Sequence, residues 1–279
     1  MKNIDLLHQV DMDIAKAVVA LCDKHNLTYY MLGGTMLGAI RHQGFIPWDD
    51  DIDFGMPRQD YEEFLKIAPK ELPQGLKVVN YRNTRKFQYY ITRILDQDTQ
   101  VEEERIGNDS RYTCASIDIF PIDGTPNNPI LRKIYYFRVL YHRALMSLCY
   151  KDSIDRQRKR GKLEKALLWV MERIPVNKLT TPYKQKCKID KLLRSQDVNN
   201  SQYIGNIMGA YRTREIVPAQ FYGKGAYYTF EGVQFRGLEK YDEYLTHTYG
   251  DYMQLPPEDK RKTHFKIVSI HGQKVEESL

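Results

Sequence analysis

The chain has 279 residues, of which 42% are hydrophobic and 28% are charged. These proportions exclude a disordered chain and allow one large domain or a core with a second lobe. The formal net charge of +6 favours anionic partners, whether phosphates, anionic lipid or nucleic acid, and four widely spaced cysteines without a Cys-x-x-Cys pair argue against a zinc site.

The N-terminal part alternates between helical and extended patterns. Apolar residues recur every three or four positions over residues 4–25, which predicts an amphipathic helix. The further elements expected here are a strand at 27–32, a helix at 35–41 capped by Thr35, a strand at 51–56, a helix at 57–68, and strands at 76–81, 89–95 and 115–120. This alternation predicts an α/β (α+β) fold, with a first domain over residues 1–125.

The second half of the chain divides into a helical and a mixed part. Turn-forming residues at 124–129 predict a boundary. Residues 126–200 are expected to form a helical, basic lobe, with helical patterns over 130–195 and a run of basic side chains at 156–162. Residues 201–279 are expected to form a mixed segment, with a strand at 226–235 and a helix at 240–249.

The N-terminal segment indicates where the protein resides. It carries acidic residues where a signal peptide would be apolar. The longest apolar runs are far shorter than the ~20 residues that a membrane-spanning helix needs. We therefore expect a cytoplasmic protein.

An acidic run points to metal chemistry. In an extended segment Asp49, Asp51 and Asp53 would share one face, with Asp50 and Ile52 on the other. Asp51 and Asp53 would then lie about 7 Å apart along the strand. Two carboxylates at that spacing can share Mg²⁺, whose charge relieves their repulsion. A solvated acidic turn is the alternative interpretation.

A glycine pair predicts the second half of the same site. Gly33 and Gly34 would let backbone N–H groups approach a phosphate, and Thr35 would begin a helix whose N-terminus favours an anion. Arg41 and His42, one or two turns further on, can reach the same anion. A Gly-Gly turn followed closely by Asp-x-Asp is therefore interpreted as a phosphate and metal site.

Several motifs together resemble the LicD family of phosphocholine transferases, which is similar to the fukutin-type ribitol-phosphate transferases. The matching segments are Gly33-Gly34-Thr35, Leu37-Gly38-Ala39, Arg41-His42, residues 44–53 (GFIPWDDDID), residues 118–123 (DIFPID), residues 230–232 (FEG), residues 249–253 (YGDYM), residues 255–257 (LPP), Arg261 and His264. They extend from residue 30 to about residue 265, nearly the whole chain.

The resemblance implies a nucleotidyltransferase-type mixed sheet with flanking helices and a helical lobe. It implies a phosphotransferase that moves phosphocholine from CDP-choline to a sugar hydroxyl of a cell-surface glycan precursor, a teichoic acid or lipopolysaccharide sugar, and releases CMP. Asp118 would be the third acid, on a strand beside that of Asp51 and Asp53. Residues 201–279 would complete the active-site cleft.

The remaining roles follow from these expectations. Asp51 and Asp53 would hold Mg²⁺ or Mn²⁺, and Asp118 would either complete the metal site or accept the proton of the attacking hydroxyl. Arg93 is a candidate phosphate ligand, with a surface salt bridge as its alternative role. His264 would contact the phosphate or cap a turn.

Two other enzyme classes remain open at this stage. A CDP-alditol (ribitol-phosphate) transferase would share the metal and phosphate parts and need hydroxyl-binding residues in place of aromatic ones. A nucleic-acid nucleotidyltransferase would need a long basic stripe with interleaved aromatic residues. We favour a lipid-linked oligosaccharide acceptor and no nucleic acid partner. The basic helices are either a solvated face of an ordinary helical lobe or a surface for peripheral contact with an anionic membrane at its inner face.

Overall fold

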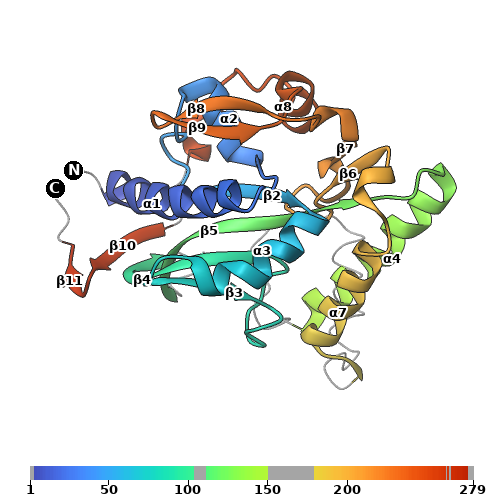
Figure 1. Ribbon diagram of the computed structural model, residues 1–279, viewed down its shortest axis with the longest axis horizontal. Helices are drawn as coiled ribbons and strands as arrows, with labels where there is room; N and C mark the ends of the chain where they lie inside the picture. Colours follow the sequence, from blue (N-terminus) through green and yellow to red (C-terminus); the bar gives the residue numbers. More distant parts are fainter. Residues whose placement is uncertain (1–2, 104–110, 150–178, 262, 264, 276–279) are drawn as a thin grey trace.

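A mixed sheet lies at the centre of the computed structural model, which describes residues 3–103, 111–149, 179–261, 263 and 265–275 (Figure 1). The strand order is β1-β2-β5-β4-β10-β11; β3 also pairs with β4, and β6 and β7 continue from β5. These strands are β1 (Tyr30–Met31), β2 (Asp53–Pro57), β3 (Leu76–Asn80), β4 (Thr92–Glu103), β5 (Arg111–Gly124), β6 (Tyr203–Gly205), β7 (Ile216–Pro218), β10 (Phe265–Ile270) and β11 (Gln273–Lys274). The expected α/β (α+β) fold is confirmed.

The sheet register aligns three charged residues. β2 and β5 run parallel, and Asp53 is the partner of Asp118. β4 runs antiparallel to β5, and Arg93 is the partner of the same Asp118. Paired residues on neighbouring strands are in contact distance on one face of a sheet, so Asp53, Asp118 and Arg93 form a row across three strands.

Two amphipathic helices cover the sheet. The N-terminal helix α1 (Asn3–Lys24) packs against β4, β5 and β10, and its buried residues include Leu7, Ile14, Val18 and Leu21. The helix α3 (Arg58–Glu71) packs against β2, β3 and β5. Both helices confirm the expected amphipathic patterns, because their apolar faces join the same core as the strands.

A helical pair stands beside the end of β5 (Figure 1). The helices α4 (Pro129–Cys149) and α7 (Pro182–Leu193) pack together. Buried ion pairs connect α7 to α3 and β5: the Arg58 guanidinium of α3 lies 2.6 Å from Asp123 Oδ2 of β5 and 3.4 Å from Asp190 Oδ1 of α7. The basic run expected at 156–162 lies outside the described residues. Among the described helices, none is long and apolar enough to cross a membrane.

A hairpin and a short helix form a layer above α1 in Figure 1. The strand expected at 226–235 is wrong, because the segment forms two strands, β8 (Ala226–Phe230) and β9 (Val233–Gly237), that pair with each other. The turn residues Glu231 and Gly232 have positive φ angles of 48° and 74°, which reverse the chain direction. The helix expected at 240–249 is confirmed as α8 (Tyr241–Tyr249).

Short single-turn helices complete the C-terminal part of the chain. They are η2 (Val198–Asn200), η3 (Arg212–Glu215), η4 (Ala219–Phe221) and η5 (Glu258–Lys260).

The elements around the glycine pair begin at other residues than expected. The helix α2 (Gly33–His42) follows Leu32 as its N-cap, so the expected Thr35 cap is wrong. Thr35 Oγ1 instead accepts a hydrogen bond of 2.8 Å from Asp53 N. Regular strand structure starts only at Asp53, and Asp51 lies in the preceding loop. Thr35 therefore joins the start of α2 to the start of β2.

Candidate active site

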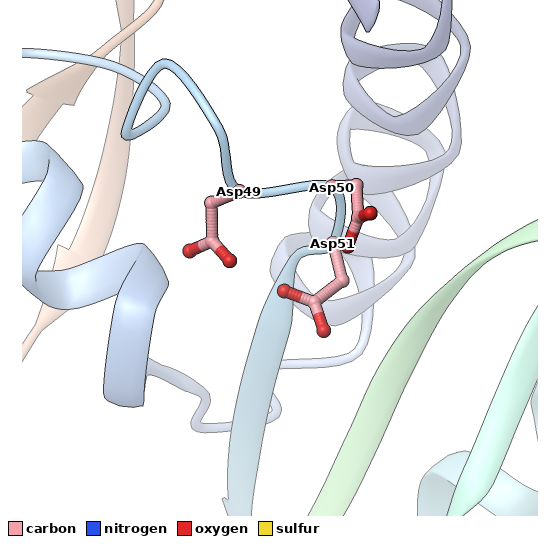
Figure 2. A group of neighbouring side chains, drawn as sticks. All are labelled: Asp49, Asp50 and Asp51. Atoms are coloured by element: carbon pink, nitrogen blue, oxygen red, sulfur yellow. The ribbon is translucent and has the colours of Figure 1, made fainter. Parts of the chain in front are cut away.

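Alternate acids that lead into β2 line one cavity. Asp49, Asp51 and Asp53 border a cavity of about 870 Å³ beside α2. Asp50 is turned away, because its Oδ2 accepts a hydrogen bond of 2.8 Å from Phe265 N on β10. Carboxylate oxygens of Asp49, Asp50 and Asp51 lie within 4.8 Å of one another, and Figure 2 shows the three side chains on the loop that leads into β2.

Asp118 lies beside these acids. Together with Asp51 and Asp53 it borders a second cavity of about 190 Å³. Arg93 Nε donates a hydrogen bond of 2.8 Å to Asp118 Oδ1, and the Arg93 guanidinium carbon lies 4.6 Å from the centre of the Tyr89 ring. The structure thus brings the predicted acids together, and it places Arg93 in an ion pair with one of them.

The acids crowd negative charge in a buried place. Burial, and then the charges of the neighbouring aspartates, raise the pKa values of Asp51 and Asp53 well above the usual range. Burial also raises the pKa of Asp118, and the Arg93 charge opposes that rise. Asp53 Oδ1 is buried and has no hydrogen-bond partner among the described residues. A buried carboxylate oxygen without a donor, beside two further carboxylates, fits a divalent cation with oxygen ligands.

A further buried acid, Asp11, interacts electrostatically with the cluster. Both carboxylate oxygens of Asp11 on α1 are buried and have no hydrogen-bond partner within the described part of the chain. Burial, and then the charge of Asp51, raise its pKa well above the usual range. Burial and the neighbouring aspartates thus both disfavour a charge on Asp11.

The glycine pair allows the acids to approach α2. A Cβ atom on Gly34 would lie 2.3 Å from Asp49 Oδ2, and one on Gly33, whose φ is +53°, would lie 3.3 Å from Asp53 Oδ2. The Gly33 N–H donates a hydrogen bond to the Tyr244 hydroxyl. The N–H groups of Gly34 and Thr35 precede the first hydrogen bond of the helix, from Met36 N to Leu32 O, so they belong to the helix N-terminus that can receive an anion.

Basic side chains lie on the same large cavity as the acids. Arg41 and Arg261 both border it. Arg41 Nη1 donates a hydrogen bond of 2.7 Å to Tyr252 O, and Arg261 lies 5.1 Å from the centre of the Trp48 ring. His42 contacts the edge of the Trp48 ring and is not among the residues that border the cavity. His264 lies outside the described residues.

The large cavity also has an aromatic wall. Its aromatic residues are Trp48, Tyr211, Tyr249 and Tyr252. Tyr211 and Tyr249 meet edge to face, with ring centres 5.7 Å apart. Of the other aromatic residues near the motifs, Phe120 borders the smaller cavity, whereas Tyr29 and Tyr30 lie in the core.

Two distant elements hold the acidic loop in place. Glu231, in the turn of the β8–β9 hairpin, accepts a hydrogen bond of 3.1 Å from Phe45 N. His8 of α1 stacks on the Phe45 ring at 3.8 Å and forms a hydrogen bond of 2.7 Å with Asp49 O. Phe-Glu-Gly therefore acts at the site by fixing the loop between α2 and the aspartates.

Comparison with known proteins agrees with these features. Residues 26–183 match the family described as LicD/FKTN/FKRP, nucleotidyltransferase domain. The chain is 32% identical over 272 residues to the lipopolysaccharide cholinephosphotransferase LicD of Haemophilus influenzae, over 95% of this chain and 97% of that protein. The chain belongs to the LicD family.

A shorter match reaches the mammalian branch of the family. The ribitol 5-phosphate transferases FKRP of mouse and human are 40% identical to this chain over 48 residues, which is 17% of this chain and 10% of theirs. Family membership and the long match to the bacterial transferase identify this chain as a phosphotransferase. The expected resemblance is confirmed.

Some residues of this LicD-family site have weak sequence signals. Asp49 is the exception, because the alternation that predicted Asp51 and Asp53 on one face also predicted Asp49 there. Arg261 lies in a conspicuous C-terminal motif. Its large separation from the acids along the chain, however, does not indicate that it borders the same cavity. Tyr211 and Glu215 border the smaller cavity and lie in a segment without any motif. Only the fold brings that segment to the acids.

Proposed function

We propose that this chain transfers phosphocholine from CDP-choline to a hydroxyl of a cell-surface glycan precursor, a lipopolysaccharide or teichoic acid sugar, and releases CMP. The observation that carries the proposal is the position of the acids between two cavities, because Asp51 and Asp53 border both of them. A donor in the larger cavity and an acceptor hydroxyl in the smaller one would meet at these carboxylates.

The larger cavity has the chemistry that the donor needs. Arg41 and Arg261 supply positive charge for the diphosphate, and the N–H groups of Gly34 and Thr35 supply donors at a helix N-terminus. A trimethylammonium group donates no hydrogen bond and is best held by aromatic faces. The aromatic wall of this cavity therefore favours choline over a polyhydroxylated alditol.

The acids fit Mg²⁺, with Mn²⁺ as the alternative. Asp51 and Asp53 would hold the ion, and Asp118 or Asp49 would complete the set, because their oxygens lie on the same cavities and Asp53 Oδ1 lacks a donor. When bound, the metal would neutralise charge on the diphosphate and on the departing phosphate. Arg93 would keep Asp118 oriented through their ion pair.

A donor panel with matched variants tests the proposal. We expect CMP release from CDP-choline in the presence of Mg²⁺ and much less from CDP-ribitol. Asp51→Asn should lose most turnover and keep its fold, whereas Asp50→Asn should keep turnover, since its amide oxygen can still accept from Phe265 N. Turnover from CDP-ribitol alone would favour the alditol-phosphate transferase, and an active Asp51→Asn protein would refute the metal site.

The acceptor is tested in cells. The chain is expressed in Haemophilus influenzae that lacks its own cholinephosphotransferase, and phosphocholine on lipopolysaccharide is measured with an antibody. Restored phosphocholine is the expected result, since the long match is to the lipopolysaccharide enzyme of that organism. CMP release in vitro without restored phosphocholine would point to a teichoic acid sugar instead.

Helix α4 has the properties of a surface that contacts an anionic membrane, and we propose this role for it. Its sequence contains no acidic residue. Five large apolar side chains on it are exposed: Ile130, Leu131, Ile134, Phe137 and Tyr141. Exposed Lys133 and Arg138 lie among them. Apolar side chains beside cations suit anionic lipid, and a lipid-linked acceptor would be presented at such a surface.

Vesicle sedimentation tests the membrane contact. The protein should pellet with phosphatidylserine-containing vesicles more than with phosphatidylcholine vesicles, and Phe137→Ser should weaken this binding. Met253→Ser, an exposed methionine at another place, is the matched control. Equal binding of wild type and Phe137→Ser would refute the proposal. A dimer that Phe137→Ser abolishes, without vesicle binding, would show that a second copy covers this face.

A further inference from the structure

The smaller cavity contains a fourth acid, Glu215, which the proposed donor site does not use. Glu215 ends η3 and directly precedes β7. Because β7 pairs with β6, and β6 pairs with the end of β5, the loop at 206–215 returns to the strand that carries Asp118. Glu215 therefore borders the same 190 Å³ cavity as Asp51, Asp53 and Asp118.

The Glu215 side chain is held in a defined position. Its Oε1 accepts a hydrogen bond of 2.8 Å from Tyr211 N. The carboxylate lies against Gly209, where a Cβ atom would come within 2.0 Å of Oε2. Arg143 of α4 fixes this loop by donating hydrogen bonds of 3.0 and 2.9 Å to the carbonyl oxygens of Ile207 and Gly209. The carboxylate is thus positioned before any ligand binds.

The surroundings of Glu215 suit proton transfer near neutral pH. Burial raises its pKa to about 7, while the Tyr211 N–H and the Arg143 charge act in the opposite direction. Among the described residues, Asp53 of β2, Tyr244 of α8 and Tyr222 after η4 also interact electrostatically with it. A carboxyl group with a pKa near the working pH is an effective acceptor and donor of protons.

The other acids of the cavity are less suited to this task. Asp118 is paired with Arg93, and a carboxylate held by a cation is a poor base. Asp51 and Asp53 are the proposed metal ligands. In the described part of the chain, Arg93 pairs with Asp118, and the closely spaced group of Asp49, Asp50 and Asp51 does not include Glu215. Among the carboxylates named here, Glu215 is therefore the one that is available to accept the proton of the acceptor hydroxyl.

We propose that Glu215 is the general base that deprotonates the acceptor hydroxyl, an inference that rests on the proposed phosphocholine transfer. The acceptor O–H bond breaks and its proton passes to the Glu215 carboxylate. The acceptor oxygen forms a bond to the choline-bearing phosphorus, and the bond from that phosphorus to the bridging oxygen breaks. CMP leaves with the electron pair, and Glu215 then releases its proton to water.

The test separates Glu215 from donor binding. CMP release is measured with CDP-choline, Mg²⁺ and lipopolysaccharide that lacks phosphocholine, isolated from Haemophilus influenzae without its own transferase. Glu215→Gln retains an oxygen for the Tyr211 N–H, so the fold should persist in circular dichroism. We expect its kcat to fall by about 10²–10⁴-fold, with the Kd for CDP-choline within about twofold of wild type by calorimetry. Glu243→Gln, an exposed acid on α8, is the matched control.

Two further readouts distinguish a base from a structural residue. The kcat/KM of wild type should rise with pH up to about 7 and then level off, and Glu215→Gln should lack this rise. Formate should partly restore turnover to Glu215→Ala, because it supplies a carboxylate in the space that the Glu215 side chain occupies in the wild type. Loss of donor affinity equal to the loss of kcat, or an unchanged pH profile in Glu215→Gln, would overturn the proposal.

The outcomes also separate the two levels of inference. If wild type turns over and Glu215→Gln keeps more than a tenth of its kcat, the general-base role is refuted and the proposed transfer stands. If wild type releases no CMP from CDP-choline with any acceptor fraction, the proposed transfer is refuted and the role of Glu215 falls with it.

Discussion

Replacing Gly34 by alanine tests how closely the acids must approach α2. The added Cβ would lie 2.3 Å from Asp49 Oδ2, whereas heavy atoms in contact prefer about 3.5 Å. The Asp49 carboxylate must therefore move by about 1 Å. A displacement of that size at a reacting centre can cost about 10²-fold in rate. We expect Gly34→Ala to lower kcat/KM for CDP-choline by about this factor.

The stability of the same variant should not fall. Gly34 does not have a positive φ angle, and alanine favours a helix over glycine by about 1 kcal/mol. The midpoint of thermal unfolding should be unchanged or higher, so that lost activity cannot be ascribed to unfolding. The measurement is CMP release with Mg²⁺, paired with a thermal melt of each protein.

A double-mutant cycle identifies the clash as the cause. Asp49→Ala removes the carboxylate that the new Cβ would meet, so Gly34→Ala should cost little more in that background. The reasoning is refuted if Gly34→Ala keeps kcat/KM within threefold of wild type. An equal loss in the Asp49→Ala background would also refute it.

Two predictions concern the fold. Arg58→Met leaves Asp123 buried without its partner, so the free energy of unfolding in urea should fall by about 3–5 kcal/mol. Lys66 is exposed, so Lys66→Met should change this free energy little. Equal effects of the two substitutions would contradict the argument. Burial lowers the pKa of Lys186 to about 8, below the ordinary ~10.4. The unfolded chain then binds the extra proton between these values, so thermal stability from this group rises with pH there. Lys186→Met should remove that rise and the exposed Lys188→Met should keep it.

The local sequence was sufficient for most regular elements. The three- and four-residue spacing of α1 and the residues of α3 and α8 placed these helices close to their observed bounds. Such patterns are readable because each helix buries one side against a core. The hairpin was missed because Glu231, at a positive φ of 48°, is not a residue type that usually marks a tight turn.

The acidic motif likewise carried its own information. The spacing of Asp49, Asp51 and Asp53 predicted that their side chains share one face, and all three border the large cavity. Asp50 and Ile52 lie away from that cavity, as expected. This alternation holds although regular strand structure begins only at Asp53. Chain geometry over a few residues sets such alternation.

Tertiary structure decided which distant residues join that motif. The register of three strands, and no local pattern, sets Arg93 beside Asp118 and Asp118 beside Asp53. Strands β6 and β7 return Glu215 to the same place. The sequence by itself determined the acids, the glycine pair and the main helices, because these depend on neighbours along the chain. The partners of the acids depend on how strands pair across long separations, which only the folded sheet defines.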